Sequence, residues 1–316
     1  MALTIRSLHP LFVAEVTGVD LALPLPDEVF AEIHAAFDRY AILVFPGQPL
    51  TDEQQLEFSR RFGPLETAPN YAGKALRLRN EFTDISNLDY EGKILDPKDR
   101  LNGYNSGNQL WHTDSSFKVR RAKCSLLSAR ELPPTGGETQ YADMRSAYDA
   151  LAPDRRAELA DLVAMHSIAT SRSKIGFDGF NDDITTALPP VPQRLVDHYP
   201  DSGRTSLYLA HHASHLLGMP IEQGRALLEE LIEFATQERF VYTQNWQVGD
   251  LVVWDNRATM HRGRPYDLTH RRVLHRTTVS DVLTAFEERA TPAQRAAVEA
   301  EAPEHAARQE SARASN

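Results

Sequence analysis

Two separate stretches of the chain carry side chains that can ligate a metal ion. His112 and Asp114 lie two residues apart in NQLWHTDSSF, and on a β-strand this spacing places both side chains on one face. His261 lies in a strand-like piece after DLVVWDN, so it can supply a third ligand from an adjacent strand. Two imidazoles and one carboxylate form a facial triad, which leaves the opposite coordination positions of iron(II) open for a co-substrate and dioxygen. The set predicts a catalytic iron site, although a His-x-Asp pair alone is a weak signal in a chain with 12 histidines.

Two arginines near the end of the chain can bind anions. In RRVLHRTTVS, strand alternation places Arg272 and Arg276 on the same face. Guanidinium geometry suits bidentate carboxylate binding, so a dicarboxylate co-substrate and an anionic substrate would together satisfy both charges. Thr139 follows the Gly-Gly turn of TGGETQYADM and could add a hydroxyl donor to the same carboxylate as Arg272. The alternative is that both arginines lie on the solvated face of an edge strand.

Composition narrows the class of protein. The chain has 316 residues and a net charge of -10, and it offers no basic stripe, which argues against a nucleic-acid partner. Cys124 is the single cysteine, so no intramolecular disulfide can form. The N-terminus lacks the pattern of a signal peptide, and no apolar run approaches the ~18 residues of a membrane span. We expect a cytoplasmic enzyme that acts on an anionic small molecule and contacts no membrane.

The pattern of elements favours a mostly β fold with peripheral helices. Short β-type runs recur between turn residues, at 41–45, 124–132, 205–211 and 250–254. Helices are predicted after the capping box of Thr51 and Gln54 with Gly63 as C-cap, from Pro153 at the first helical position, and between Pro220 and Gln237. These features predict a jelly roll, that is, a double-stranded β-helix. We expect one domain over residues 1–284 and an Ala/Glu-rich tail over 285–316 that is helical or disordered.

Several motifs in order resemble one known family. They are EVTGVDL, FPGQPLTDEQQLEFSRRFGPLE, NQLWHTDSSF, LPPTGGETQYADM and WDNRATMHRGRPYDLTHRRVLHRTTV. Over roughly residues 10 to 282 the chain resembles the taurine and 2,4-dichlorophenoxyacetate dioxygenases, which are 2-oxoglutarate-dependent jelly-roll enzymes. The resemblance implies a full set of roles: iron(II) bound by His112, Asp114 and His261, the distal carboxylate of 2-oxoglutarate bound by Thr139 and Arg272, the substrate anion facing Arg276, and Asn108 and Ser115 flanking the pocket. It also implies self-association into a homo-oligomer, as in many relatives.

Within that family, the region from SNLDYEGK to YDAL looks closest to the phenoxyacetate-cleaving branch. Ala68 stands where taurine-type enzymes carry a substrate-binding histidine, while Tyr71 keeps a pocket-facing aromatic ring. Tyr199 stands where the phenoxyacetate branch carries a histidine before proline, which is a departure from that pattern. The resemblance implies hydroxylation of the carbon beside the ether oxygen of an aryloxyalkanoate, which releases a phenol and a 2-oxo acid with succinate and CO2.

Two other functions stay open from the sequence. The same chemistry could act on an alkyl sulfonate such as taurine or on an alkyl sulfate ester, because Arg276 can pair with any such anion. A metal-binding jelly roll without oxygenase activity, or a zinc hydrolase, is the alternative from another class. Thr139 and Arg272 argue against that alternative, because a hydrolase has little use for a second anion site.

Overall fold

A computed structural model describes residues 3–67, 76–177, 188–282 and 286–301. Its largest sheet has seven strands, and neighbouring strands run antiparallel except for β2 and β3. In spatial order these strands are β1 (Thr4–Ser7), β2 (Ala14–Thr17), β3 (Ile42–Phe45), β13 (Leu251–Asp255), β5 (Ala122–Glu131), β15 (Val273–Ser280) and β4 (Phe82–Ser86). The C-terminal strand β15 therefore lies inside the sheet, between strands from early parts of the chain.

Three smaller sheets complete the β-structure. They are β12 (Val241–Gln244) with β6 (Thr139–Asp143) and β14 (Thr259–Gly263), β11 (Ala213–Leu216) with β7 (Val163–His166) and β8 (Val191–Arg194), and β10 (Arg204–Leu207) with β9 (Val196–Tyr199). Tyr141 of β6 packs in one buried cluster with Trp254 of β13 and Leu274 of β15, which joins this small sheet to the large one. Two mainly antiparallel sheets packed around a shared core are the architecture of a jelly roll, as predicted.

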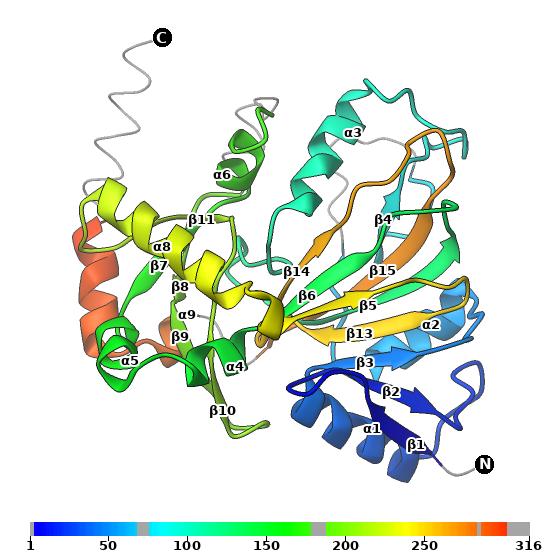
Figure 1. Ribbon diagram of the computed structural model, residues 1–316, viewed down its shortest axis with the longest axis horizontal. Helices are drawn as coiled ribbons and strands as arrows, with labels where there is room; N and C mark the ends of the chain where they lie inside the picture. The colour runs from blue at the N-terminus through cyan, green and yellow to red at the C-terminus, as the bar shows by residue number, and fades with distance from the viewer. Residues whose placement is uncertain (1–2, 68–75, 178–187, 283–285, 302–316) are drawn as a thin grey trace.

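Helices surround the sheets, as expected. They are α1 (Asp27–Tyr40), α2 (Asp52–Arg60), α3 (Arg100–Asn105), α4 (Met144–Asp149), α5 (Pro153–Leu159), α6 (Ile168–Ser173), α8 (Ile221–Ala235) and α9 (Phe286–Arg289), with 3-10 turns η1 (Ser106–Gln109) and η2 (Glu238–Phe240). Figure 1 shows α1 and α2 against the large sheet, and α5, α8 and α9 grouped on the other side of the molecule. None of the helices in the described ranges is long and apolar enough to cross a membrane.

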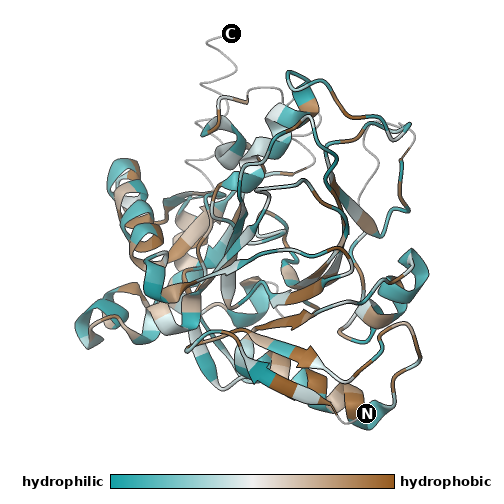
Figure 2. Ribbon diagram, turned by 45° about the vertical axis from the view of Figure 1, so that its right-hand side comes forward, coloured by the Kyte–Doolittle hydropathy of each residue, from teal (hydrophilic) through white to brown (hydrophobic). Residues whose placement is uncertain are grey.

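The predicted helix starts are confirmed. Thr51 and Gln54 form both hydrogen bonds of a capping box at the start of α2, and Pro153 lies at the first turn of α5. Helix α8 buries Leu228 and Leu231 against β11 and its neighbours, as its three- and four-residue periodicity predicts. Figure 2 shows helices that carry both hydrophobic and hydrophilic residues, and hydrophobic segments on several strands.

Helix α2 determines which face of β15 is available for a site. The buried Gln55 amide donates to the backbone oxygen of His275 (2.9 Å), and Ser59 bonds to Thr277 (2.7 Å), so α2 covers the face that carries these odd-numbered residues. The prediction of Gly63 as the C-cap is wrong, because the helix ends at Arg60 with Arg61 as its cap. Gly63 is needed for close packing instead, since a Cβ there would lie 2.9 Å from Val279 of β15.

The end of the chain is helical where it is described. Helix α9 and residues 292–301 follow the last strand, and Phe286 and Ala290 are buried in a small cluster with Val163 and Leu217. Residues 302–316 lie outside the described residues, so the division into a domain and a tail near residue 284 stays a prediction.

Candidate active site

The three predicted metal ligands converge between the two packed sheets. One ligand atom each from His112, Asp114 and His261 can be chosen so that all lie within 4.8 Å of one another, and all three residues are buried. The backbones of His112 and His261 exchange two hydrogen bonds (3.0 and 2.8 Å), which holds the first histidine against strand β14. The Nε2 atoms of His112 and His261 lie 3.9 and 3.7 Å from Asp114 Oδ1. This cluster could hold one metal ion.

The local structure around the first two ligands differs from the prediction. His112 forms only an isolated bridge, and Asp114 begins a turn in which Ser115 has a positive φ of 54°. The expectation of a regular strand here is therefore wrong. The reason is tertiary: the Asp114 N–H is bound by the side chain of Asn256 (3.2 Å), which bends the chain away from strand pairing. Both ligands still point into the same site.

The protonation of the cluster suits a divalent metal. The Nδ1 atom of His112 lies 2.7 Å from the backbone oxygen of Leu110, which can only accept, so Nδ1 carries the proton and Nε2 keeps its lone pair. Burial lowers the pKa of His112 and, more strongly, that of His261, which keeps both rings neutral. Burial alone would raise the pKa of Asp114, but the Arg276 guanidinium, with smaller contributions from other neighbours that include the Ser125 hydroxyl, lowers it to about 2. Two neutral imidazoles and one carboxylate fit the facial triad of iron(II).

A chain of buried polar groups orients the carboxylate of Asp114. The Ser125 hydroxyl donates to Asp114 Oδ2 (2.8 Å), and the Asn256 amide donates to Ser125 (2.9 Å). Trp254 Nε1 in turn donates to Asn256 Oδ1 (3.0 Å). Sequence reasoning missed Ser125 and Asn256. A serine in a strand carries no distinctive signal, whereas Asn256 stands inside the quoted motif WDNRATMH and could have been suspected from it.

A cavity of about 110 Å³, here called the inner cavity, adjoins the metal cluster. Its lining includes His112, His261, Thr139 and Arg272, so the structure brings together the ligands and the two residues predicted to bind a carboxylate. The Trp246 indole donates to Thr139 Oγ1 (3.0 Å), which leaves the hydroxyl proton of Thr139 available for another acceptor. Nothing in the sequence pointed to this contact, because Trp246 follows β12 whereas Thr139 lies on β6, far away along the chain.

Arg272 is built into the wall of the inner cavity. Its side chain is buried, and its Nη2 donates to the backbone oxygen of Gly137 (2.9 Å), whereas its Nε has no partner. Gly137 has a φ of +75°, and a Cβ at this position would lie 2.8 Å from Arg272 Nε. The Gly-Gly turn therefore makes room for the guanidinium. Arg272 forms no ion pair with a carboxylate of the described residues, and burial lowers its pKa.

A second cavity of about 280 Å³, here called the outer cavity, is also lined by Arg276. Arg276, Asn108 and His112 line both cavities, so the cavities meet at the metal cluster. Arg276 Nη1 donates to Asp114 Oδ1 (2.5 Å). Arg272 and Arg276 both line the inner cavity, and Leu274, which stands between them in the sequence, is buried in one cluster with Trp254 of the same cavity wall, so the predicted alternation is confirmed.

Of the other residues predicted near the pocket, the structure describes Asn108 and Ser115. Asn108 accepts a hydrogen bond from Arg172 (3.2 Å), and Ser115 lines the outer cavity while donating to Glu66 (2.8 Å). Tyr71 and Ala68 lie outside the described residues.

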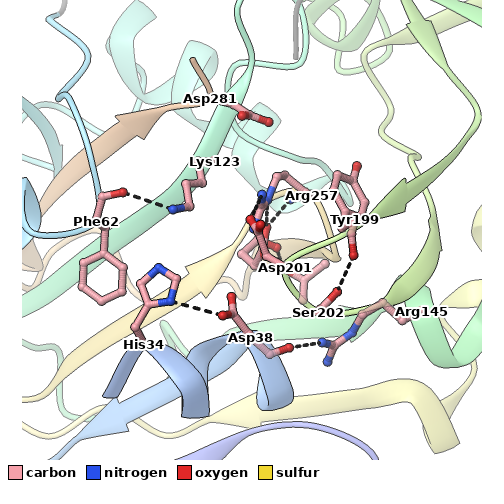
Figure 3. Close-up of polar contacts among 12 residues, drawn as sticks. His34, Asp38, Phe62, Lys123, Arg145, Tyr199, Asp201, Ser202, Arg257 and Asp281 are labelled. Carbon is pink, nitrogen blue, oxygen red and sulfur yellow. Dashed lines mark hydrogen bonds and ion pairs between the residues drawn. The ribbon is translucent and has the colours of Figure 1, made fainter. Parts of the chain in front are cut away.

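Tyr199 lies away from both cavities. Its ring is buried and faces three guanidinium groups, those of Arg121, Arg257 and Arg289, at 5.6, 5.1 and 5.5 Å. Figure 3 shows Tyr199 beside Arg257, in a network that also contains Asp201 and Asp281. Tyr199 is not among the residues that line either cavity. The position at which the resemblance predicted a histidine therefore lies in this buried network, outside the described cavity walls.

Together, the fold and the ligand set define a jelly-roll protein with a facial-triad metal site. Residues 4–278 match the family described as "Taurine catabolism dioxygenase TauD, TfdA family". The chain belongs to this family, as its motifs predicted.

Three relatives are especially informative. The alpha-ketoglutarate-dependent 2,4-dichlorophenoxyacetate dioxygenase of Cupriavidus pinatubonensis is 45% identical, over 89% of this chain and 99% of that protein. The (S)-phenoxypropionate/alpha-ketoglutarate-dioxygenase of Sphingobium herbicidovorans is 39% identical, over 88% of this chain and 95% of that protein. The crystal structure of AAD-2 in complex with Mn(II) and N-oxalylglycine superposes with a TM-score of 0.83 at 45% identity, over 90% of this chain and 99% of the other.

Proposed function

We propose that this protein is an iron(II)- and 2-oxoglutarate-dependent dioxygenase that cleaves the ether bond of an aryloxyalkanoate. The observation that carries the proposal is Arg272, a buried cation without an acidic partner among the described residues, which lines the cavity beside the metal cluster. Burying a charge is unfavourable unless an anion pairs with it, so this position suits the distal carboxylate of 2-oxoglutarate. The identity to relatives that act on 2,4-dichlorophenoxyacetate and phenoxypropionate supports the substrate class.

Each polar residue then has a defined task. His112, Asp114 and His261 would hold iron(II), which would supply the activation of dioxygen when 2-oxoglutarate is bound. Thr139 and Arg272 would hold the co-substrate through charge-assisted hydrogen bonds from one side of the inner cavity. Arg276 would face the anionic group of the substrate, and the ring would lie against apolar side chains of the outer cavity, which include Ile85, Phe117 and Ile168.

The overall reaction balances with these components. One oxygen atom of dioxygen enters succinate as 2-oxoglutarate loses CO2, and the other replaces hydrogen with hydroxyl at the substrate carbon beside the ether oxygen. The resulting hemiacetal loses its C–O bond to the aryl oxygen, which takes up the hydroxyl proton and leaves as a phenol. The former side chain becomes a 2-oxo acid. The protein's contribution is placement of that one carbon beside the metal cluster.

A substrate panel tests the proposal. Purified enzyme with iron(II), 2-oxoglutarate and oxygen should be given aryloxyacetates, aryloxypropionates, alkyl sulfonates including taurine, and alkyl sulfate esters. Succinate and phenol should form in equal amounts from the aryloxy acids. Preferential release of sulfite or sulfate would assign the same chemistry to another substrate, and succinate formation with none of them would favour a metal-binding protein of another class.

We further propose that the enzyme acts in the cytoplasm, self-associates and binds no nucleic acid. Fractionation of cells and sedimentation of the purified enzyme would test the first two points.

A further inference from the structure

A second arginine faces the outer cavity, and the sequence did not single it out. Arg172 of α6 is only 4% exposed and lines this cavity together with Arg276. Its guanidinium lies over the ring of Tyr104 (4.3 Å), and its Nη2 donates to Asn108 Oδ1 (3.2 Å). Its Nε is buried and has no partner. Among the described residues, no carboxylate forms an ion pair with Arg172.

The chain makes room for this arginine. A Cβ at Gly107, in the 3-10 turn η1, would lie 2.1 Å from Arg172 Nη1 and 2.6 Å from its Cζ. Nothing larger than glycine fits there while the guanidinium keeps its place. Arg172 is therefore seated between η1 and the ring of Tyr104, with its charge directed to the outer cavity.

The buried charge of Arg172 has no anion paired with it among the described residues. A guanidinium buried without an anion loses its hydration and gains no Coulomb attraction in return. The nearby positive charge of Arg276 adds repulsion, and burial together with this repulsion lowers the pKa of Arg172. Arg276 already shares its charge with Asp114, whereas Arg172 has only the neutral groups of Tyr104 and Asn108. An anion bound in the outer cavity would satisfy both arginines.

We infer that Arg172 is a second substrate-binding residue, which together with Arg276 binds the carboxylate of the aryloxyalkanoate and so selects acids over neutral ethers. This inference rests on the proposed function. Arg172 and Arg276 come from different elements, α6 and β15, so the carboxylate would be held from two sides. The α-carbon next to that carboxylate is the one to be oxidised, and two contacts fix its position more firmly than one.

The test compares an acid with its neutral amide. Affinities for an aryloxyacetate and for the matching aryloxyacetamide are measured by calorimetry on anaerobic enzyme that holds iron(II) and 2-oxoglutarate, so that no turnover occurs. Arg172→Gln should weaken binding of the acid roughly tenfold to hundredfold and change binding of the amide less than about threefold, because only the acid loses a charge-assisted bond. Affinity for 2-oxoglutarate should stay within about twofold, because Arg172 does not line the inner cavity.

Two further variants keep the inference falsifiable if Arg172→Gln folds poorly. Arg172→Lys retains the charge and should recover part of the acid affinity, whereas Gly107→Ala should displace the guanidinium and weaken binding of the acid with Arg172 still present. Arg156→Gln is the matched control, since Arg156 also lies over a tyrosine ring, that of Tyr148 at 5.3 Å, but lines neither cavity. Arg156→Gln should leave both affinities unchanged.

The outcomes separate the two proposals. Equal loss of acid and amide binding in Arg172→Gln would show that Arg172 only supports the wall of the outer cavity. This result would overturn the inference, but phenol formation by the wild-type enzyme would still support the proposed function. If the wild-type enzyme forms no phenol from any aryloxy acid, the proposed function fails first, before any variant is compared.

Discussion

Arginines are buried in two parts of this molecule, and their partners differ. In the network around Tyr199, Arg121 is 2% exposed and lies 2.7 Å from Asp197 and 3.6 Å from Asp281. In the cavities beside the metal cluster, Arg272 is 6% exposed and forms no ion pair with a carboxylate of the described chain. Both are isolated from water, but within the described residues only Arg121 has carboxylates of the protein beside it.

The difference teaches how to separate structural from ligand-binding arginines. A buried guanidinium needs an anion, and in the network around Tyr199 the chain provides aspartates for that purpose. Among the described residues, Arg272 and Arg172 have instead a backbone oxygen and an amide oxygen as hydrogen-bond acceptors, so their positive charges are left for a ligand to neutralise. Arg276 is intermediate, because it lines both cavities and also pairs with Asp114 at 2.5 Å. Four predictions test this division.

The largest effect is expected at the metal cluster itself. Replacement of His112, Asp114 or His261 by Ala should abolish metal binding and turnover, because each removes one of only three protein ligands. Iron content and the visible absorption of anaerobic enzyme with iron(II) and 2-oxoglutarate are the measurements. His198→Ala, an exposed histidine on β9, is the control and should keep full activity. Activity restored by zinc would contradict the oxygenase assignment.

The next largest effect is expected on stability. Arg121→Met should lower the free energy of unfolding by about 3–5 kcal/mol, because it removes a buried cation that lies 2.7 Å from Asp197 and 3.6 Å from Asp281. Urea denaturation measures this, with the exposed neighbour Arg120→Met as control. The KM for 2-oxoglutarate should not change. A loss under about 1 kcal/mol would mean that the network contributes no more than surface ion pairs do.

Arg272→Ala should give the opposite pattern. The KM for 2-oxoglutarate should rise roughly a hundredfold or more, because the bound carboxylate loses a desolvated partner. Stability should change little, since no acidic side chain is left without its cation. The adjacent Arg271→Ala is the matched control, because Arg271 points outward and pairs with Glu131. A change of only a few-fold in KM would show that the co-substrate binds elsewhere.

The smallest of the four effects is expected at Arg276, the intermediate case. Arg276→Ala should reduce phenol formation roughly tenfold, because one of two substrate contacts is lost, with less effect on the KM for 2-oxoglutarate. Some 2-oxoglutarate should still be consumed without product, so the ratio of succinate to phenol should exceed that of the wild-type enzyme. If 2-oxoglutarate binding falls as far as in Arg272→Ala, Arg276 belongs to the co-substrate site.

Local patterns in the sequence determined much of the architecture and several site residues. The capping box of Thr51 and Gln54 and the periodicity of α8 involve residues within a few positions of one another, so they were visible without tertiary structure. The same holds for the strand alternation that places Arg272 and Arg276 on one face. The ligand types themselves limited the metal chemistry.

Only the tertiary structure decided the contacts that join distant parts of the chain. Asn256 lies 142 residues from Asp114, and its bond to the Asp114 N–H replaces the predicted strand by a turn. Arg172 meets Asn108 across 64 residues. Whether a buried arginine has an aspartate or a ligand as its partner depends on which elements the fold brings together, and no spacing along the chain encodes that.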